Sequence, residues 1–400
     1  MQKQHLNKNL ILIIISYLAF ISLGLPDGLL GIAWPFMNVK FGVPLDALGI
    51  LLISFVAGYL LTSLANGKIM AKIPLGILLA LSCSLTGLSL LGYAFANHWY
   101  MVIIMSFFLG AGGGAIDASI NTFAAAHFSA SIVNWLHAFY GIGATTGPLF
   151  ITWMLVHGQQ WYDGYILVGF IQVILSILFL ITLRYWKVNA DKKEKLAPAT
   201  KYLETLRMPL VWLSFIIFFL YTGLEIGVGQ WIFTILTKSR HLSEGAAGLW
   251  VSVYWGSLTV GRMLFGVILT KYPVHKMLIG ALTGVVVGAL LLTLDLSNFI
   301  SLIGIIGIGI FNAPVFPSLI SITPKRVGEK HVANVIGFQV SAAMIGGALL
   351  PGFAGFMINY WGLEVIPKIY LVEAILLLGI YLITSKIHDT IKERVECKSQ

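Results

Sequence analysis

The sequence predicts an all-α polytopic membrane protein with twelve transmembrane helices in two six-helix, pseudo-symmetric bundles. Its composition, the length of its apolar runs and an internal repeat lead to this fold class. Hydrophobic residues make up 58% of the 400 residues and charged residues only 10%, whereas soluble chains carry about 25% charged residues. So few charges could not cover the surface of a soluble domain. The composition therefore excludes a soluble fold, a disordered chain and a secreted disulfide scaffold.

The apolar runs have the length of membrane-spanning helices. A helix needs about 20 apolar residues to cross a bilayer, whereas barrel strands read as alternating segments of about ten residues. The first run is too long for a cleaved signal peptide, and further spans follow it directly. The predicted spans are 10–33, 48–70, 74–95, 100–126, 131–157, 163–186, 208–236, 246–271, 275–294, 298–322, 331–358 and 364–386.

One long polar stretch follows the sixth span and divides the chain. It is rich in lysine and glutamate and contains Pro198, which is typical of a solvated linker. The predicted domains are an N-terminal six-helix bundle over 1–186, a cytoplasmic linker over 187–207, a C-terminal six-helix bundle over 208–386 and a cytoplasmic tail over 387–400.

Basic residues are distributed unequally between the two sides of the predicted membrane protein. If the termini and the linker share one side, that side carries 20 of the 25 basic residues, and the other side carries four. Arg262 lies within the eighth span. Because cytoplasmic loops carry the excess of Lys and Arg, both termini are predicted to be cytoplasmic in a multi-pass protein of the cell membrane. The excess charge then faces anionic lipid, and no nucleic-acid partner is expected.

The two halves of the chain repeat with unchanged topology. The residues that recur at an offset of 199 are Gly67, Lys72 and Pro74 after the second span, and Gly266, Lys271 and Pro273 after the eighth. A parallel repeat of six helices resembles the pattern of major facilitator transporters.

The two cysteines, Cys83 and Cys397, are too few for a disulfide framework or a metal site. Neither a metal nor another cofactor is therefore expected.

Four acidic residues fall inside the predicted spans, away from their ends: Asp27, Asp117, Glu225 and Glu373. A charge in mid-membrane costs about 3 kcal/mol on insertion scales, so such residues face a cavity or a partner. Loss of water favours the neutral form of a carboxyl group, which allows it to load and release a proton. Asp27, Asp117 and Glu225 are the predicted proton-coupling residues, whereas a structural role is expected for Glu373.

The first two acids lie in unusual local sequences. Asp27 follows Pro26 and is flanked by glycines, so the first helix is expected to break there and expose polar backbone. Asp117 and Asn121 are four residues apart and share one helix face. The glycines at 112–114, just before Asp117, would allow neighbouring helices to approach closely.

Polar and aromatic residues near these acids suggest a sugar site. Glu225, Gln230 and Trp231 combine a carboxylate, an amide and an indole, which pair with sugar hydroxyls and stack on the apolar face of a pyranose. Each candidate could instead serve interhelical packing. The predicted substrate contacts are Asp27, Asn121, Asn134, His137, Tyr140, Glu225, Gln230, Trp231, Tyr254, Trp255, Asn312 and Gln339.

Within the major facilitator superfamily, the motifs most resemble the fucose–galactose–glucose:proton symporters, the fucose permease group. Asp27 matches the helix-one acid of that group. The run from Asp117 to Phe123 is similar to its acid-x-x-x-Asn-Pro-Phe motif, with Asp for Glu and Thr122 for Pro. The resemblance implies uptake of a neutral hexose or deoxyhexose with a proton, by alternating access. It also implies that Asp117 carries the proton, Asp27 binds sugar and Arg262 acts as a gate.

Several alternatives remain open at this point. A proton-driven efflux antiporter of amphipathic molecules would use the same acids, and a sugar symporter could use sodium instead of protons. A non-transporting nutrient sensor is disfavoured by the short tail. An enzyme is not expected, because the sequence shows no nucleophile–base pair, metal cluster or phosphate loop. The partners expected are a small-molecule substrate and the lipid bilayer, and the protein is expected to be a monomer.

Overall fold

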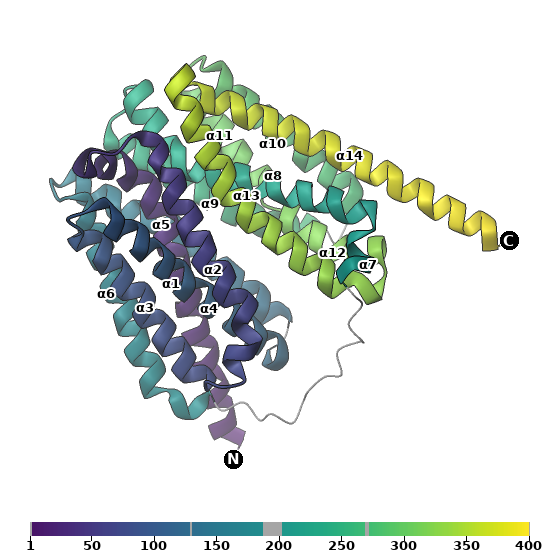
Figure 1. The fold of residues 1–400 in the computed structure, drawn as a ribbon, viewed down its shortest axis with the longest axis horizontal. Helices are drawn as coiled ribbons and strands as arrows, with labels where there is room; N and C mark the ends of the chain where they lie inside the picture. Colours follow the sequence, from purple (N-terminus) through teal and green to yellow (C-terminus); the bar gives the residue numbers. More distant parts are fainter. Residues whose placement is uncertain (1, 129, 187–201, 269–271, 400) are drawn as a thin grey trace. The chain divides into compact units, whose positions relative to one another are not determined.

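The computed structural model describes residues 2–128, 130–186, 202–268 and 272–399, and all regular elements within these ranges are helices. The first six are α1 (Gln2–Phe41), α2 (Leu48–Met70), α3 (Leu75–Phe95), α4 (Trp99–His127), α5 (Ala130–Val156) and α6 (Trp161–Ile181) (Figure 1). They are followed by α7 (Tyr202–Leu206), α8 (Pro209–Thr234), α9 (Glu244–Ile268), α10 (Val274–Leu294), α11 (Asn298–Asn312), α12 (Val315–Val327), α13 (Val332–Trp361) and α14 (Val365–Ser399). All twelve predicted spans coincide with helical segments, so the predicted fold class is confirmed.

Eleven helical segments of the described ranges are long and apolar enough to cross a membrane. The predicted eighth span corresponds to α9, which is a helix but is not among these eleven. The end of this predicted span, residues 269–271, lies outside the described residues, and α9 carries polar side chains such as Ser252, Ser257 and Arg262. The proteins of this fold class tolerate such side chains where they face other helices instead of lipid.

The predicted break in the first helix is wrong, because α1 continues through Pro26. Proline lacks the N–H that would bond to the carbonyl four residues earlier, which here belongs to Ser22. The Gln172 side chain on α6 replaces that donor, since its Nε2 donates to the Ser22 carbonyl at 2.8 Å. A side chain from a neighbouring helix therefore allows α1 to remain continuous beside Asp27.

The predicted tenth span is interrupted where the sequence analysis expected one helix. Helix α11 ends at Asn312, a turn covers Ala313 and Pro314, and α12 begins at Val315. Pro314 cannot continue the α11 hydrogen-bond ladder, which explains the position of the break. Asn312 consequently lies at the end of a helix and not in the middle of one.

The chain forms two compact units, which we describe separately. Unit 1 comprises residues 1–191 and 229–259, and unit 2 comprises 192–228 and 260–400. The boundary between the units therefore runs through α8 and α9. The predicted division into bundles on either side of a linker stays a prediction, and residues 187–201 of that linker lie outside the described residues. The predicted tail continues α14 as far as Ser399.

Close helix packing in unit 1 is made possible by glycine. The main helix pairs are α1 with α5, α2 with α4, and α3 with both α4 and α6. A Cβ atom at Gly114 would lie 2.8 Å from Thr62 Oγ1 of α2, and one at Gly112 would lie 2.8 Å from the Ser82 carbonyl oxygen of α3. These glycines therefore bring α4 against two different helices, as their sequence predicted.

In unit 2, α10 packs against both α11 and α14. The N-cap residue of α10 is Pro273, and the N-cap residue of α3 in unit 1 is Pro74, so the repeated prolines start equivalent helices. The buried core of unit 2 includes Phe218, Leu278 and Tyr381. Glycines also allow α10 and α11 to pack closely, since a Cβ at Gly288 would lie 2.8 Å from the Gly304 carbonyl oxygen.

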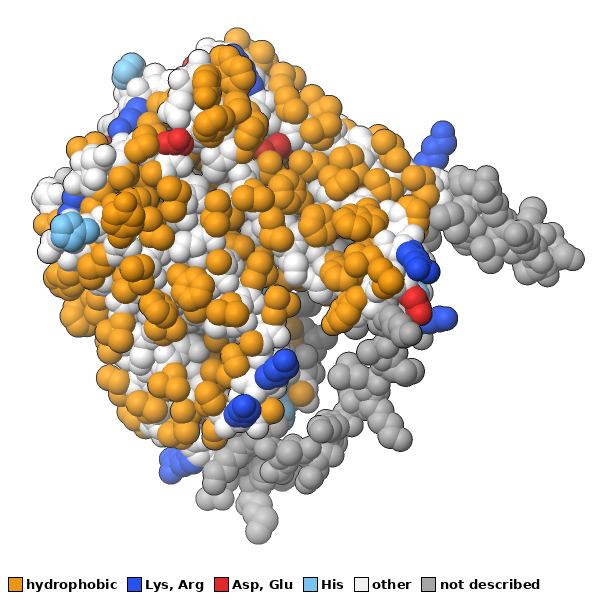
Figure 2. All heavy atoms as spheres, viewed as in Figure 1, with side chains coloured by type: hydrophobic (Ala, Val, Ile, Leu, Met, Phe, Trp, Pro, Cys, Tyr) orange, Lys and Arg blue, Asp and Glu red, His pale blue; other side chains and the backbone are white. Residues whose placement is uncertain are grey.

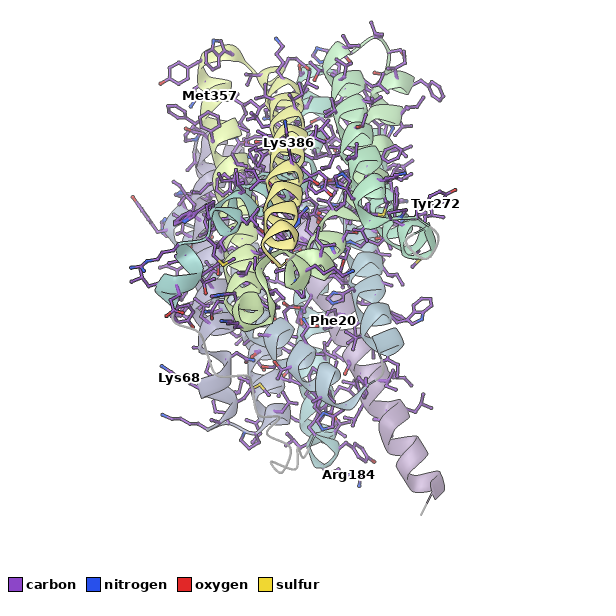
Figure 3. All side chains as sticks on the ribbon, turned by 90° about the vertical axis from the view of Figure 1, so that its right-hand side faces the viewer. Phe20, Lys68, Arg184, Tyr272, Met357 and Lys386 are labelled. Carbon is purple, nitrogen blue, oxygen red and sulfur yellow. The ribbon has the colours of Figure 1, made fainter. Side chains whose placement is uncertain are left out.

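The visible face of the molecule is dominated by hydrophobic side chains, with few charged groups between them (Figure 2). Large exposed side chains such as Leu64, Phe170 and Trp153 are at least half exposed to solvent in the isolated chain. Such a surface suits contact with lipid acyl chains and not with water. Within unit 1, Lys68 and Arg184 lie at the same end (Figure 3), as their predicted location on one side of the membrane requires.

Candidate substrate and proton site

The carboxylate of Asp117 on α4 is held by two neutral donors. The Tyr59 hydroxyl on α2 donates to Oδ2 at 2.6 Å, and Asn121 Nδ2 donates to Oδ1 at 2.9 Å. Asp117 and Asn121 therefore lie on one helix face, as their spacing predicted. Each carboxylate oxygen therefore has its own hydrogen-bond donor.

Tyr59 is a site residue that the sequence analysis missed. None of the predicted site residues lies in the second predicted span, which corresponds to α2. A polar stripe formed by Tyr59, Thr62 and Asn66 at helical spacing could have revealed it. All three residues bond to α4: Thr62 Oγ1 donates to the Ala111 carbonyl at 2.8 Å, and Asn66 Oδ1 accepts from Ser119 at 2.8 Å.

Asp27 on α1 is half-buried and lies in contact with α5 and α8. The Tyr140 hydroxyl donates to the Asp27 carboxylate, and Gln230 Nε2 donates to the Asp27 backbone carbonyl at 3.2 Å. Tyr59 lies within electrostatic range of Asp27 as well as of Asp117. Unit 1 thus brings together two of the predicted proton-coupling residues.

His137 of α5 is exposed and makes an edge contact with the Phe20 ring at 5.6 Å between ring centres. It lies within electrostatic range of Asp117. The side chain of Asn134, predicted to share this helix face, lies outside the described residues. The structure therefore places Tyr140 and His137 of the predicted α5 stripe near the two acids.

Aromatic residues of α8 and α9 lie close to Gln230 in unit 1. Trp231 and Tyr254 are fully buried, and the Tyr254 and Trp255 rings are 5.4 Å apart. A Cβ at Gly229 would lie 3.3 Å from Trp255 Nε1, so that indole borders the segment that carries Gln230. Trp255 Nε1 and Gln230 Oε1 are buried without a hydrogen-bond partner in the described part of the chain. One donor and one acceptor of this part of unit 1 are therefore unsatisfied among the described residues.

Glu225 on α8 belongs to unit 2 and is paired with a cation. Arg262 of α9 lies 3.3 Å from Glu225 Oε1, and the Tyr221 hydroxyl donates to Oε2. Glu225 is buried, with 7% exposure. A buried charge is retained when it is paired and hydrogen-bonded, which accounts for both Glu225 and Arg262.

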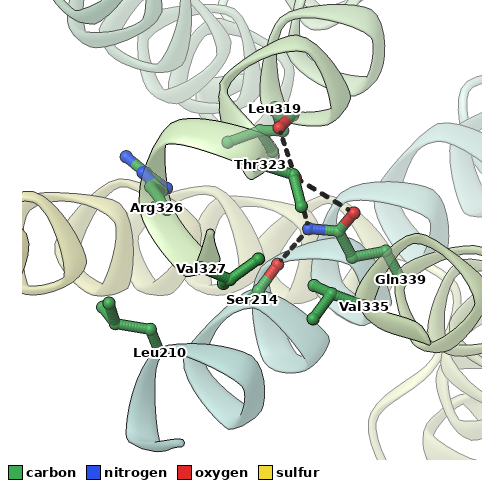
Figure 4. Close-up of a pocket in the computed structure, with 8 residues that line it drawn as sticks. All are labelled: Leu210, Ser214, Leu319, Thr323, Arg326, Val327, Val335 and Gln339. Atoms are coloured by element: carbon green, nitrogen blue, oxygen red, sulfur yellow. Dashed lines mark hydrogen bonds between the residues drawn. The ribbon is translucent and has the colours of Figure 1, made fainter. Parts of the chain in front are cut away.

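Two amides of unit 2 differ sharply in their surroundings. Gln339 joins three helices, because its Nε2 donates to Ser214 Oγ at 2.5 Å and to Thr323 Oγ1 at 3.0 Å (Figure 4). Asn312 is fully buried, and neither its nitrogen nor its oxygen has a partner among the described residues. The geometry of Gln339 therefore resembles an interhelical link, whereas the amide of Asn312 is unsatisfied among the described residues.

Glu373 of α14 is also buried, with 5% exposure. Its Oε2 and the hydroxyl of Tyr370, one turn earlier, have no hydrogen-bond partner in the described ranges. Its predicted structural role stays a prediction. Cys83 is a buried free thiol, and no group of three potential metal ligands occurs among the described residues.

Comparison with known proteins identifies the family. A model described as Major Facilitator Superfamily matches residues 16–243 and 229–394. The glucose/mannose transporter GlcP of Bacillus subtilis is 24% identical over 379 residues, which covers 91% of this chain and 92% of GlcP. This relative agrees with the predicted resemblance to sugar transporters.

Solved structures share the fold at low sequence identity. The nucleoside transporter NupG has a TM-score of 0.78 at 15% identity and covers 95% of this chain and 99% of its own. The E. coli fucose:proton symporter FucP has a TM-score of 0.65 at 17% identity and covers 96% and 98%. The family consists of membrane transporters that work without a cofactor, not of enzymes. Because the family model matches nearly the whole chain, this multi-pass membrane protein belongs to the Major Facilitator Superfamily.

Proposed function

We propose that the protein takes up a neutral monosaccharide, a hexose or deoxyhexose, together with a proton by alternating access. The observation that carries the proposal is the difference between two membrane acids. Asp117 is held by the neutral donors Tyr59 and Asn121, whereas Glu225 is paired with Arg262. The first acid can change its charge alone, and the second cannot.

Protonation would affect the two acids differently. A proton on Glu225 would leave the Arg262 guanidinium partly buried without its counter-charge, which is costly. A proton on Asp117 removes a charge from the bundle while its two neutral hydrogen-bond partners stay in place, which is favourable when water is excluded. We therefore assign the coupling proton to Asp117. Glu225, which the sequence also predicts to couple protons, instead stays ionised as the partner of Arg262.

The groups around Asp27 suit a sugar. Its carboxylate and the hydroxyl of Tyr140 can exchange hydrogen bonds with ligand hydroxyls, while Gln230 Oε1 and Trp255 Nε1 supply an acceptor and a donor. The buried indole rings offer apolar faces for the C–H side of a pyranose. The name of GlcP, a glucose/mannose transporter, supports the same substrate class.

In the proposed cycle, the neutral form of Asp117 permits the sugar-loaded carrier to reorient, and the charged form does not. Sugar binding at Asp27 and proton binding at Asp117 are linked because both groups interact with Tyr59. The protein is proposed to act as a monomer in the cell membrane with both termini in the cytoplasm. Arg262 is proposed to gate the path through its pairing with Glu225.

Purified protein in proteoliposomes tests the function. Addition of glucose, galactose, mannose or fucose outside should raise the external pH when a sugar enters with a proton. Repeating the assay with sodium varied at constant pH separates sodium coupling from proton coupling. If none of these sugars moves a proton, whereas preloaded amphipathic dyes leave the vesicles when a proton gradient is applied, the efflux alternative holds.

A further inference from the structure

The position of Tyr59 is fixed by the close contact between α2 and α4. A Cβ at Gly110 would lie 2.7 Å from the Phe55 carbonyl carbon, and one at Gly58 would lie 2.9 Å from the Ala111 nitrogen. Thr62 then links the two backbones through its bond to Ala111. Because backbone meets backbone on both sides of Tyr59, its hydroxyl is presented to Asp117 by a rigid helix pair.

The two partners of Asp117 have different hydrogen-bonding capacity. The Asn121 Nδ2 group can only donate, whereas the Tyr59 hydroxyl can donate or accept. When Asp117 is ionised, both partners donate to it, as the structure shows. When a proton occupies Oδ2, the Tyr59 oxygen can accept it and Asn121 can continue to donate to Oδ1. The same contacts therefore serve both protonation states.

The other ionisable groups near this pair come from α1 and α5. Asp27 of α1 interacts electrostatically with Tyr59, and His137 of α5 interacts with Asp117. Helix α3 presents Ser82 and Thr86 to the Gly112 turn of α4. Tyr59 is thus the ionisable group in direct hydrogen-bond contact with Asp117, and it also interacts with the second acid.

We infer that Tyr59 is a positioning residue for proton coupling, which keeps Asp117 Oδ2 hydrogen-bonded in both protonation states and sets the pH at which its proton is released. The inference rests on the proposed function, in which Asp117 carries the proton. Without Tyr59, the ionised carboxylate keeps only the Asn121 donor. Asp117 should then hold its proton to a higher pH.

The test compares Tyr59→Phe with Tyr165→Phe, a matched control whose buried hydroxyl has no partner in the described part of the chain. Exchange of radiolabelled glucose at equal concentrations across proteoliposomes is measured against pH. Exchange needs the protonated carrier and should decline as the pH rises. A lost bond to a charged group corresponds to an upward shift of about one to two pH units in Tyr59→Phe. Tyr165→Phe should match the wild type.

Two results separate the inference from the proposed function. If Tyr59→Phe has the same exchange midpoint as the wild type, Tyr59 does not set proton release, although the proposed function stands. If the wild type neither exchanges a sugar nor moves protons, the proposed function fails and the inference fails with it.

A measurement on the wild type decides the matter if Tyr59→Phe does not fold. Infrared difference spectra taken across a pH step show the C=O band of protonated Asp117, which is identified by its loss in Asp117→Asn. A low-frequency band, typical of an acid bonded at both oxygens, supports a persistent contact with Tyr59. A high-frequency band, typical of a free acid group, overturns it.

Discussion

Arg262 lies 3.3 Å from Glu225 Oε1, and this ion pair joins α9 to α8 within unit 2. It accounts for Arg262 and for one of the four acidic residues found away from the ends of the predicted spans. The Tyr221 hydroxyl satisfies the other oxygen of Glu225. The pair carries no net charge, so in the proposed transport cycle the coupling proton is assigned to a different residue.

Removing one member of this pair should destabilise the protein more than removing both. We expect Glu225→Gln to lower the free energy of unfolding by about 2 kcal/mol, less than the roughly 3–5 kcal/mol of fully buried pairs, because Arg262 keeps 26% exposure. Glu225→Gln combined with Arg262→Gln should recover about half of that loss. Thermal unfolding in detergent measures both effects, and additive losses would mean that the two side chains are not energetically paired.

Asp117→Asn should separate exchange from accumulation. The amide resembles the protonated acid in shape and charge, so sugar exchange across the membrane should continue. It cannot release a proton, so uphill uptake should fall to equal concentrations on the two sides. Counterflow and proton-driven uptake in the same proteoliposomes check this result. Full uphill uptake by Asp117→Asn would assign the coupling proton to another residue.

The sequence predicted the helices and the three acids more successfully than their partners. Charge is scarce in the spans, so Asp27, Asp117 and Glu225 could be found without a structure. Tyr59 could not be recognised as a partner of Asp117, because hydroxyls are common in membrane helices and the spacing between α2 and α4 depends on glycine contacts between residues far apart in the sequence, such as Gly58 and Phe107. Long-range contacts of this kind leave no local pattern.

The continuous first helix illustrates the same limit. The effect of Pro26 on its own helix follows from covalent structure, but the donor that replaces the missing N–H belongs to Gln172, 150 residues away. The sequence therefore predicted a break in α1, whereas a hydrogen bond from another helix replaces the missing donor and α1 stays continuous. The predicted tenth span shows the converse, since its helix is interrupted at Pro314 between Asn312 and Val315.

The contribution of the Gln172 hydrogen bond to the stability of α1 can be measured directly. Gln172→Leu leaves the Ser22 carbonyl without its donor, and we expect a loss of about 1 kcal/mol in the free energy of unfolding. Pro26→Ala restores a backbone N–H that can bond to the same carbonyl. In the Pro26→Ala background, Gln172→Leu should therefore cost less. An equal cost in both backgrounds would show that Gln172 stabilises the bundle by other contacts.

Tyr140→Phe should weaken sugar binding and leave the pH profile of exchange in place. Its hydroxyl bonds to Asp27, the proposed sugar ligand, and not to Asp117. Loss of a hydrogen bond to a charged group corresponds to a roughly tenfold higher dissociation constant. Binding measured by tryptophan fluorescence checks the effect, with Tyr165→Phe as the control. A shifted pH profile with unchanged affinity would exchange the roles assigned to Asp27 and Asp117.

The contact between α1 and the α8 segment of unit 1 should depend on Gly31. A Cβ at Gly31 would lie 3.0 Å from Gln230 Cα and 3.1 Å from the Gln230 carbonyl oxygen. Backbone atoms cannot rotate out of the way, so Gly31→Ala should force the helices apart and weaken the bond from Gln230 to Asp27. Overpacking of this kind costs about 1–3 kcal/mol.

Gly67 of α2 is the matched control, because a Cβ there would meet nothing within 4 Å. Alanine at an open helical position usually gains about 0.5–1 kcal/mol relative to glycine. Thermal unfolding should therefore separate the two variants in opposite directions, with Gly31→Ala below the wild type and Gly67→Ala at or above it. Glucose binding should also weaken in Gly31→Ala, since Gln230 and Asp27 lie in the proposed sugar site. Equal stability of the two variants would mean that α1 and α8 do not pack as closely in the membrane as their backbones do here.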